Sequence, residues 1–233
     1  MKILRSTIEV TNSLLAKIKA GRVLAPPTDL DTVKLNLGCG LAVTPGWINI
    51  DGSINALIAN FPVFTHSFFY RVTGARAYYS KSEYCKLLGE NRFVHHELSS
   101  SIPYPDNSVD VIFSSHFLEH LYYDQALNLI NECYRSLKPG GILRISIPDL
   151  EYAIGQYHKG RKDEMLRNFF FVEEDGNHFS RHKYMYDFQM LEKILVNTGF
   201  LNVTRCSYRT GNTPDIEILD NRPEESLFVE ASR

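Results

Sequence analysis

Short apolar runs alternate along this chain with longer stretches in which apolar residues recur at helical spacing. The runs predict buried strands near residues 33–38, 47–51, 92–95, 109–114, 141–147, 201–209 and 226–231. The helical spacing predicts helices near residues 117–138, 149–159, 161–171 and 187–198. This alternation predicts an α/β fold with a doubly wound, mostly parallel seven-stranded sheet. The polar loop at 210–225 between the last two strands predicts an antiparallel C-terminal hairpin.

Helix ends are marked by residues that cannot continue a helix or that cap one. Lys138-Pro139-Gly140-Gly141 is predicted to close the first long helix and to turn the chain into the next strand. Asp187 is a predicted N-cap, and Gly199 is the predicted stop of the same helix.

The first 31 residues form a predicted arm ahead of the domain, which we place at 32–233. Apolar residues within 6–20 share one helical stripe, so we expect an amphipathic helix that packs on the domain or forms a dimer contact. A membrane anchor is the less favoured alternative, because the stretch is only modestly basic. Residues 25–31 contain two consecutive prolines and predict a linker.

Two connections depart from the ordinary length of such folds. Only six residues lie between Gly40 and Trp47, too few for a crossover helix, so a turn must replace it and one face of the sheet should be thinner there. The connection at about 52–91 is long and rich in aromatic residues. It predicts a helical insertion with its own small core, with a substrate lid or a dimerisation surface as the functional alternatives. We expect it to cover the site.

Composition narrows the class of protein. A formal net charge of −2 gives no general attraction to nucleic acid. The four cysteines are scattered without a Cys-x-x-Cys pair, which favours reduced thiols. No stretch approaches the roughly 20 apolar residues of a spanning helix, and the N-terminus has no secretory h-region, so we expect a cytoplasmic protein.

The stretch that carries most chemical information is 34–51. A buried strand ends at Gly38-Cys39-Gly40, where glycines let the backbone turn sharply and approach a ligand. The next strand ends on Asp51, whose carboxylate can accept both hydroxyls of a ribose. The third glycine of the dinucleotide fingerprint would fall on Val43, which makes a nicotinamide oxidoreductase the weaker alternative.

This stretch resembles motif I of class I S-adenosylmethionine (SAM) dependent methyltransferases of the type 11 kind, which have a Rossmann-like fold. The resemblance continues in order through four further stretches of the chain, at 102–110, 111–120, 135–144 and then 197–200 with 225–230. It implies SAM as the cofactor, with the Gly38-Cys39-Gly40 loop under its methionine part and Asp51, followed by Gly52, at the ribose. It further implies Glu97 and Leu98 at the adenine, although aspartate is commoner than Glu97 at that place.

Ser114, Ser115 and His116 follow the predicted fourth strand, at the edge where open α/β sheets bind ligands. We place Ser114 and Ser115 against the cofactor. His116 is the first candidate for a general base, with a structural role as helix cap or cofactor contact as the equal alternative. Glu119 and His120 follow at helical spacing, and we expect both to pin the helix to an adjoining loop, with His120 on the same face as His116 as the alternative.

A second polar cluster lies at 177–186. His182 is a candidate catalytic residue, and His178, Arg181 and Tyr184 are further candidates for substrate contact, with Arg181 and Lys183 suited to a phosphate or carboxylate. His178 and His182, with Asp149 and Glu119, are an alternative metal set. We predict no metal there, because Gly176 and Asn177 favour a loop and no third ligand has diagnostic spacing.

The sequence therefore predicts a SAM-dependent methyltransferase that O-methylates a small molecule or a sugar or glycan precursor by in-line displacement. The glycan acceptor is implied by resemblance to a bacterial group associated with cell-surface polysaccharide synthesis. A catalytically inactive SAM-binding scaffold or regulatory subunit is the alternative from a different class. No nucleic-acid partner and no transmembrane segment are expected, and a homodimer is left open.

Overall fold

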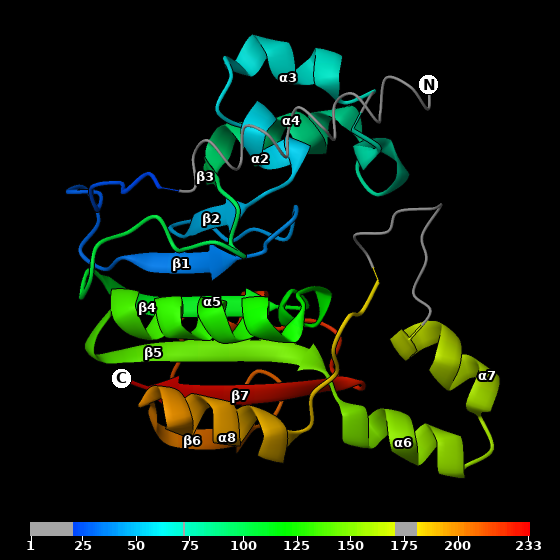
Figure 1. Cartoon of the computed structure of the whole chain (residues 1–233). Helices are drawn as coiled ribbons and strands as arrows, with labels where there is room; N and C mark the ends of the chain where they lie inside the picture. Colours follow the sequence, from blue (N-terminus) through cyan, green and yellow to red (C-terminus); the bar gives the residue numbers. More distant parts are fainter. Residues whose placement is uncertain (1–20, 72, 171–180) are drawn as a thin grey trace.

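The computed structural model describes residues 21–71, 73–170 and 181–233, so the arm helix predicted over 6–20 lies outside the described residues. A seven-stranded sheet with the order β3-β2-β1-β4-β5-β7-β6 forms the centre of the molecule (Figure 1). Its strands are β1 Lys34–Leu37, β2 Ile48–Asp51, β3 Arg92–His95, β4 Val109–Ser115, β5 Leu137–Pro148, β6 Leu201–Cys206 and β7 Ser226–Ser232. The first five pair in parallel, and β7 is antiparallel to both β5 and β6. The predicted fold class and terminal hairpin are confirmed.

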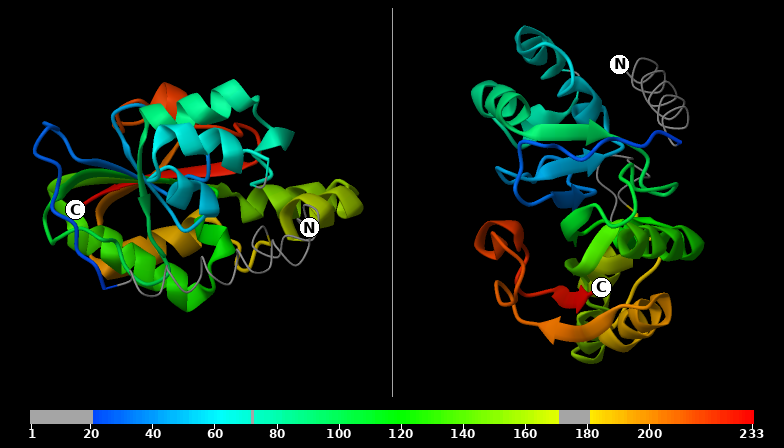
Figure 2. Two further views of the ribbon diagram at one scale, coloured as in Figure 1. Left: turned by 90° about the horizontal axis from the view of Figure 1, so that it is seen from above. Right: turned by 90° about the vertical axis from the view of Figure 1, so that its left-hand side faces the viewer.

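One face of the sheet is covered by α5 (Tyr123–Ser136) and α8 (Phe188–Thr198), as the right-hand view of Figure 2 shows. Alternate strand residues such as Leu35, Ile48 and Ile112 join the apolar sides of these helices in the main core. The caps of α8 are as predicted. Asp187 Oδ1 accepts a hydrogen bond from the Met190 amide at 2.8 Å, and Gly199 ends the helix in the left-handed conformation.

The long helix predicted over 117–138 is wrong at both ends. The chain forms a short 3-10 turn, η2 (Leu118–His120), and α5 begins only at Tyr123, because Leu121 and Tyr122 are extended. The helix already ends at Ser136, and the Lys138–Gly141 stretch belongs to β5. A left-handed Gly140 and a register shift opposite Val109 let this strand continue through the bend.

The aromatic-rich connection forms a helical insertion with its own small core, as predicted. It contains α2 (Ile54–Ile58), α3 (Val63–Phe69), η1 (Ala75–Ala77) and α4 (Lys81–Glu90). A separate small core buries Ile58, Tyr84 and Leu88 against Phe93 of β3 and Cys39 of the glycine turn. The insertion therefore supports one side of that turn.

No helix links β1 to β2, as predicted, yet the sheet face there is not bare. The segment 207–225, which contains α9 (Ile216–Leu219), packs on it and buries Trp47, Phe113 and Leu219 together. Trp47 Nε1 donates to Asp215 at 2.8 Å, and Lys34 pairs with the same carboxylate at 2.6 Å. A right-handed β1–β2 crossover would lie on this face, opposite α5. The prediction of a thin sheet face is therefore wrong, because a segment distant in sequence covers this face.

A buried charge network fixes this covering segment to the sheet. Arg144 of β5 has no exposed surface, and its guanidinium lies 2.5 Å from Asp220 and 3.0 Å from Glu230. Glu230 also accepts hydrogen bonds from the backbone amides of Asn212 and Thr213. Because both carboxylates are paired and hydrogen-bonded, their burial is compensated. Three further helices follow β5, namely α6 (Leu150–His158), α7 (Lys162–Met165) and the π-helix η3 (Leu166–Phe170).

Candidate functional site

The glycine turn after β1 has the backbone conformation that the sequence predicted. Gly38 and Gly40 have φ values of +66° and +53°, in the left-handed region that favours glycine. A β-carbon on Gly38 would overlap the base of the Phe117 side chain, whereas one on Gly40 would meet open space. The turn thus packs tightly against the segment after β4 on one side and leaves its other side accessible.

Asp51 ties the end of β2 to this turn. Its carboxylate accepts hydrogen bonds from the Gly40 amide at 2.8 Å and the Ser53 amide at 2.6 Å, one on each oxygen. An ionised carboxylate has about four acceptor positions, so further donors can still bind. The short connection between β1 and β2 is stabilised by Asn36 and Asn49, because the buried side-chain amides of these two residues are hydrogen-bonded to each other at 3.0 Å.

The end of β3 lies directly beside Asp51. The Asp51 carbonyl accepts a hydrogen bond from the His96 amide, and the next residue, Glu97, has a carboxylate oxygen 3.7 Å from where a β-carbon of Gly52 would lie. The other oxygen of Glu97 accepts from Ser99 Oγ at 2.9 Å. Leu98 is buried in the main core, so its side chain is not available at this edge. The two predicted acids are neighbours at one edge of the sheet.

The end of β4 contributes three consecutive polar residues with different surroundings. Ser114 is buried against the Leu37 carbonyl, and Ser115 contacts Asn221. His116 has a φ of +49°, an uncommon conformation for a residue other than glycine. Its Nε2 lies 2.9 Å from Ser226 Oγ, and its Nδ1 lies 3.4 Å from both Glu119 and Arg222. Both of its ring nitrogens therefore have partners.

A cavity of about 220 Å³ joins the glycine turn to the end of β4. Its lining is mixed polar and apolar and consists of Asn36, Gly38, Cys39, Gly40, Ala42, Thr44, Phe113, Ser115, His116, Ile218, Leu219, Asn221 and Arg222. The sequence predicted five of these as site residues, namely Gly38, Cys39, Gly40, Ser115 and His116, and missed the others, including all four from the 210–225 loop. Nothing local in the polar loop at 210–225 indicates this position, which depends on the buried Arg144–Asp220 pair.

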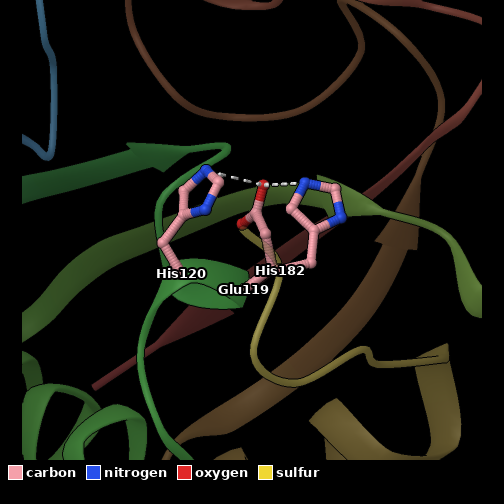
Figure 3. A group of neighbouring side chains, drawn as sticks. All are labelled: Glu119, His120 and His182. Atoms are coloured by element: carbon pink, nitrogen blue, oxygen red, sulfur yellow. Dashed lines mark ion pairs between the residues drawn. The ribbon is translucent and has the colours of Figure 1, made fainter. Parts of the chain in front are cut away.

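Glu119 is the centre of a second cluster just after His116. Its side chain is 1% exposed, and Oε1 lies 3.9 Å from His120 Nε2 and 4.0 Å from His182 Nε2 (Figure 3). Burial acts to raise the pKa of Glu119, but His116 and His120 outweigh it and hold the pKa below its ordinary value. Burial lowers the pKa of His182, with Glu119 partly opposing that shift.

The alternative metal set from the sequence is only partly assembled. Asp149 caps α6 through the Glu151 amide and pairs with Arg205 at 2.7 Å, so its carboxylate is not part of the histidine cluster. His178 lies outside the described residues. His182 does not line the cavity but reaches Glu119, together with His120. As expected, His120 contacts an adjoining loop, through the Arg181 carbonyl at 3.2 Å.

Comparisons with known proteins agree with this fold. Residues 59–145 match the family model described as "Methyltransferase domain". Over these residues the chain carries a methyltransferase domain, and its curated relatives are named probable SAM-dependent methyltransferases. A probable SAM-dependent methyltransferase of Mycobacterium tuberculosis is 28% identical over 130 residues, which cover 55% of this chain and 39% of that protein. Another from Mycolicibacterium smegmatis is 41% identical over 56 residues, covering 24% and 21%.

Solved structures extend the likeness of the methyltransferase domain to nearly the whole chain at the level of the fold. The SAM-dependent methyltransferase SibL, in its apo form, has a TM-score of 0.51 and 20% identity, covering 99% of this chain and 56% of that one. A possible exported protein from Bordetella parapertussis has a TM-score of 0.50 and 13% identity, covering 96% and 67%. In the mycobacterial relatives described above, by contrast, the matched segments span less than half of the length of each protein. No helix within the described residues is long and apolar enough to cross a membrane.

Proposed function

We propose that this protein transfers the methyl group of SAM to a hydroxyl of a small molecule or a sugar or glycan precursor. One observation carries the proposal. The glycine turn, Asp51, Glu97 and His116 come from four separate segments and meet at the same edge of the sheet, where α/β folds bind ligands. The sugar or glycan acceptor rests on the motif resemblance and on the polar side chains in the mixed lining of the cavity, such as Ser115 and Asn221, which can hydrogen-bond to a hydroxylated group.

The residues at this edge fit the cofactor. Gly40 leaves open space where a side chain would otherwise stand, so the backbone of the turn can receive the methionine part. Asp51 keeps free acceptor positions for the ribose hydroxyls, and Glu97 lies beside it for the adenine amine, with the Leu98 backbone next to the ring. Cys39 and Ser115 line the adjoining cavity and Gly52 follows Asp51, whereas Ser114 is buried behind them against the Leu37 carbonyl, so its predicted contact with the cofactor is not supported.

The chain must orient the acceptor, exclude water and remove one proton. The cofactor, when bound, supplies the electrophilic methyl group, and S-adenosylhomocysteine (SAH) is the leaving group. The acceptor oxygen forms the new carbon–oxygen bond as the sulfur–carbon bond breaks, and the hydroxyl proton passes to His116 Nε2. For this an acceptor hydroxyl takes the position that Ser226 Oγ now occupies, 2.9 Å from that nitrogen. Glu119 faces Nδ1 and stabilises the resulting imidazolium.

The cavity is smaller than the roughly 300–1,000 Å³ usual for drug-sized ligands. It therefore accommodates one small group rather than a whole cofactor and acceptor together. We place an acceptor group near Ser115, Asn221 and Arg222, with most of the cofactor over the open edge at Asp51 and Glu97. Arg222 gives this end of the cavity a positive charge suited to a phosphate, as in a sugar nucleotide.

The test is methyl transfer from labelled SAM to a panel of sugar nucleotides and free sugars. Turnover with one of these acceptors supports the proposal, and SAH binding without turnover on any acceptor favours the scaffold alternative. For the base, His116→Asn is the variant of choice, because asparagine tolerates the left-handed backbone. We expect kcat to fall about 10²–10⁴-fold with SAH affinity unchanged. An unchanged kcat would remove the base role, and weakened SAH binding would indicate a packing role. His158→Asn, on exposed α6, is the matched control.

A further inference from the structure

Glu119 is a buried carboxylate whose charge lacks hydrogen-bond compensation. Among the residues that the structure describes, neither Oε1 nor Oε2 receives a hydrogen bond of good geometry: His116 Nδ1 faces Oε1 only at 3.4 Å, and the side chain is 1% exposed. Burial of an ionised carboxylate without such bonds is strongly unfavourable. A cation at this position would remove that cost.

The two histidines that face Glu119 have their second ring nitrogens fixed by backbone carbonyls. His120 Nδ1 lies 3.2 Å from the Arg181 carbonyl, and His182 Nδ1 lies 2.7 Å from the Phe169 carbonyl. A carbonyl oxygen can only accept, so each Nδ1 carries the proton and donates. Each Nε2 is then directed at Glu119, and Figure 3 shows Glu119 between the two imidazoles. Histidines that bind metal ions are commonly oriented by this kind of second hydrogen bond.

We propose that Glu119, His120 and His182 bind one divalent first-row metal ion such as Zn²⁺. Their ligand atoms all lie within 4.8 Å of one another. Tetrahedral zinc bonds of about 2.0–2.1 Å place ligand atoms roughly 3.3 Å apart, so a shift of less than about 1 Å in each side chain closes the site. Two imidazoles and one carboxylate leave a coordination position for water or a substrate oxygen.

Backbone hydrogen bonds bring the ligands together from distant parts of the chain. The amides of Lys183 and Tyr184 both donate to the Glu119 carbonyl, at 2.7 and 3.3 Å. This ladder fixes His182 beside a residue on η2 that precedes it by more than sixty positions. The Glu119 oxygen shared by both histidines is also 3.4 Å from His116 Nδ1, so the ion would lie next to a residue that lines the cavity. The site does not depend on the identity of the acceptor.

The experiment measures Zn²⁺ binding to the full chain after chelator treatment, by competition with a chromophoric chelator and by calorimetry. We expect one equivalent of Zn²⁺ per chain and a Tm that rises with Zn²⁺ concentration. Co²⁺, used as a spectroscopic probe, should show the visible absorption of a tetrahedral ion. Glu119→Gln, His120→Asn and His182→Asn should each weaken Zn²⁺ binding by about tenfold or more.

His158→Asn is again the matched control, because this histidine is exposed on α6 and distant in sequence from the cluster. His120 is partly exposed, so its variant should fold even where Glu119→Gln does not. The proposal is overturned if the native chain binds no equivalent of Zn²⁺, which would mean that protons on the imidazoles balance Glu119. It is also overturned if the three variants bind Zn²⁺ as the native chain does, or if His158→Asn weakens binding equally. Methyl transfer measured in chelator separates this result from the proposed function, which would survive loss of the metal site.

Discussion

Replacement of Gly38 by alanine tests whether the turn after β1 is built as the structure has it. Two costs add. The left-handed backbone costs an L-residue about 1–2 kcal/mol, and the new β-carbon overlaps Cβ, Cγ and Cδ2 of Phe117, for which overpacking costs about 1–3 kcal/mol. Reduced entropy of the unfolded chain returns about 0.4–1 kcal/mol. The net loss of unfolding free energy is therefore about 1–5 kcal/mol.

The clash is with the root of the Phe117 side chain, so a rotamer change cannot relieve it and the backbone after His116 must move. For a domain of this size, each kcal/mol lowers Tm by about 2–4 °C. Urea unfolding and thermal scans of Gly38→Ala, in parallel with SAH binding by calorimetry, give both readouts. We expect weaker SAH binding as well as lower stability, because the turn and the end of β4 are displaced together.

Two other glycines serve as controls for Gly38→Ala. Gly160 and Gly40 also have positive φ, but a β-carbon on either meets no atom within 4 Å. Gly160→Ala should show the backbone cost alone, about 1 kcal/mol. Gly40→Ala should be similarly mild for stability yet should impair SAH binding. If Gly38→Ala lowers the unfolding free energy no more than Gly160→Ala, the packing of Phe117 on the turn is wrong.

The remaining predictions concern one cofactor contact and one buried acid. Asp51→Asn should weaken SAH binding by about tenfold or more, equivalent to roughly 1.4 kcal/mol. Asp163→Asn, at an exposed position of α7, is the charge-matched control. Calorimetry that finds equal affinity for Asp51→Asn and the native chain would remove Asp51 from the site. Burial acts to raise the pKa of Glu230, but Asn212, Thr213 and Arg144 outweigh it and hold the pKa below its ordinary value of 4.5. The stability from ionised Glu230 is therefore complete above about pH 4.5 and is lost as the pH falls through the lower folded-state pKa. Urea titrations across this range should show the difference between the native chain and Glu230→Gln shrinking in acid; a difference independent of pH would refute the assignment.

Much of the fold follows from local pattern. Apolar runs located all seven strands to within a few residues, except that β5 begins four residues earlier and β6 ends three residues sooner than predicted. The N-cap at Asp187 and the helix stop at Gly199 are both as predicted, because each depends only on residues within one helical turn of itself. The helix predicted from 117 failed because the left-handed His116 and the extended pair after η2 depend on contacts with Ser226, Arg222 and the 181–184 segment.

For the site, the sequence by itself determined the glycine turn, the acid that ends β2 and the polar residues that end β4, because each follows directly from where an apolar strand stops. Only the tertiary structure decided what surrounds them. The segment 207–225 replaces the missing crossover helix through the buried Arg144 network, and His182 reaches Glu119 through a backbone ladder. In each of these contacts the two residues are more than sixty positions apart in the sequence, and a local sequence pattern does not predict contacts at that separation. Strand positions are local properties of hydrophobic pattern, whereas the cavity wall and the Glu119 cluster exist only after the sheet has brought its ends together.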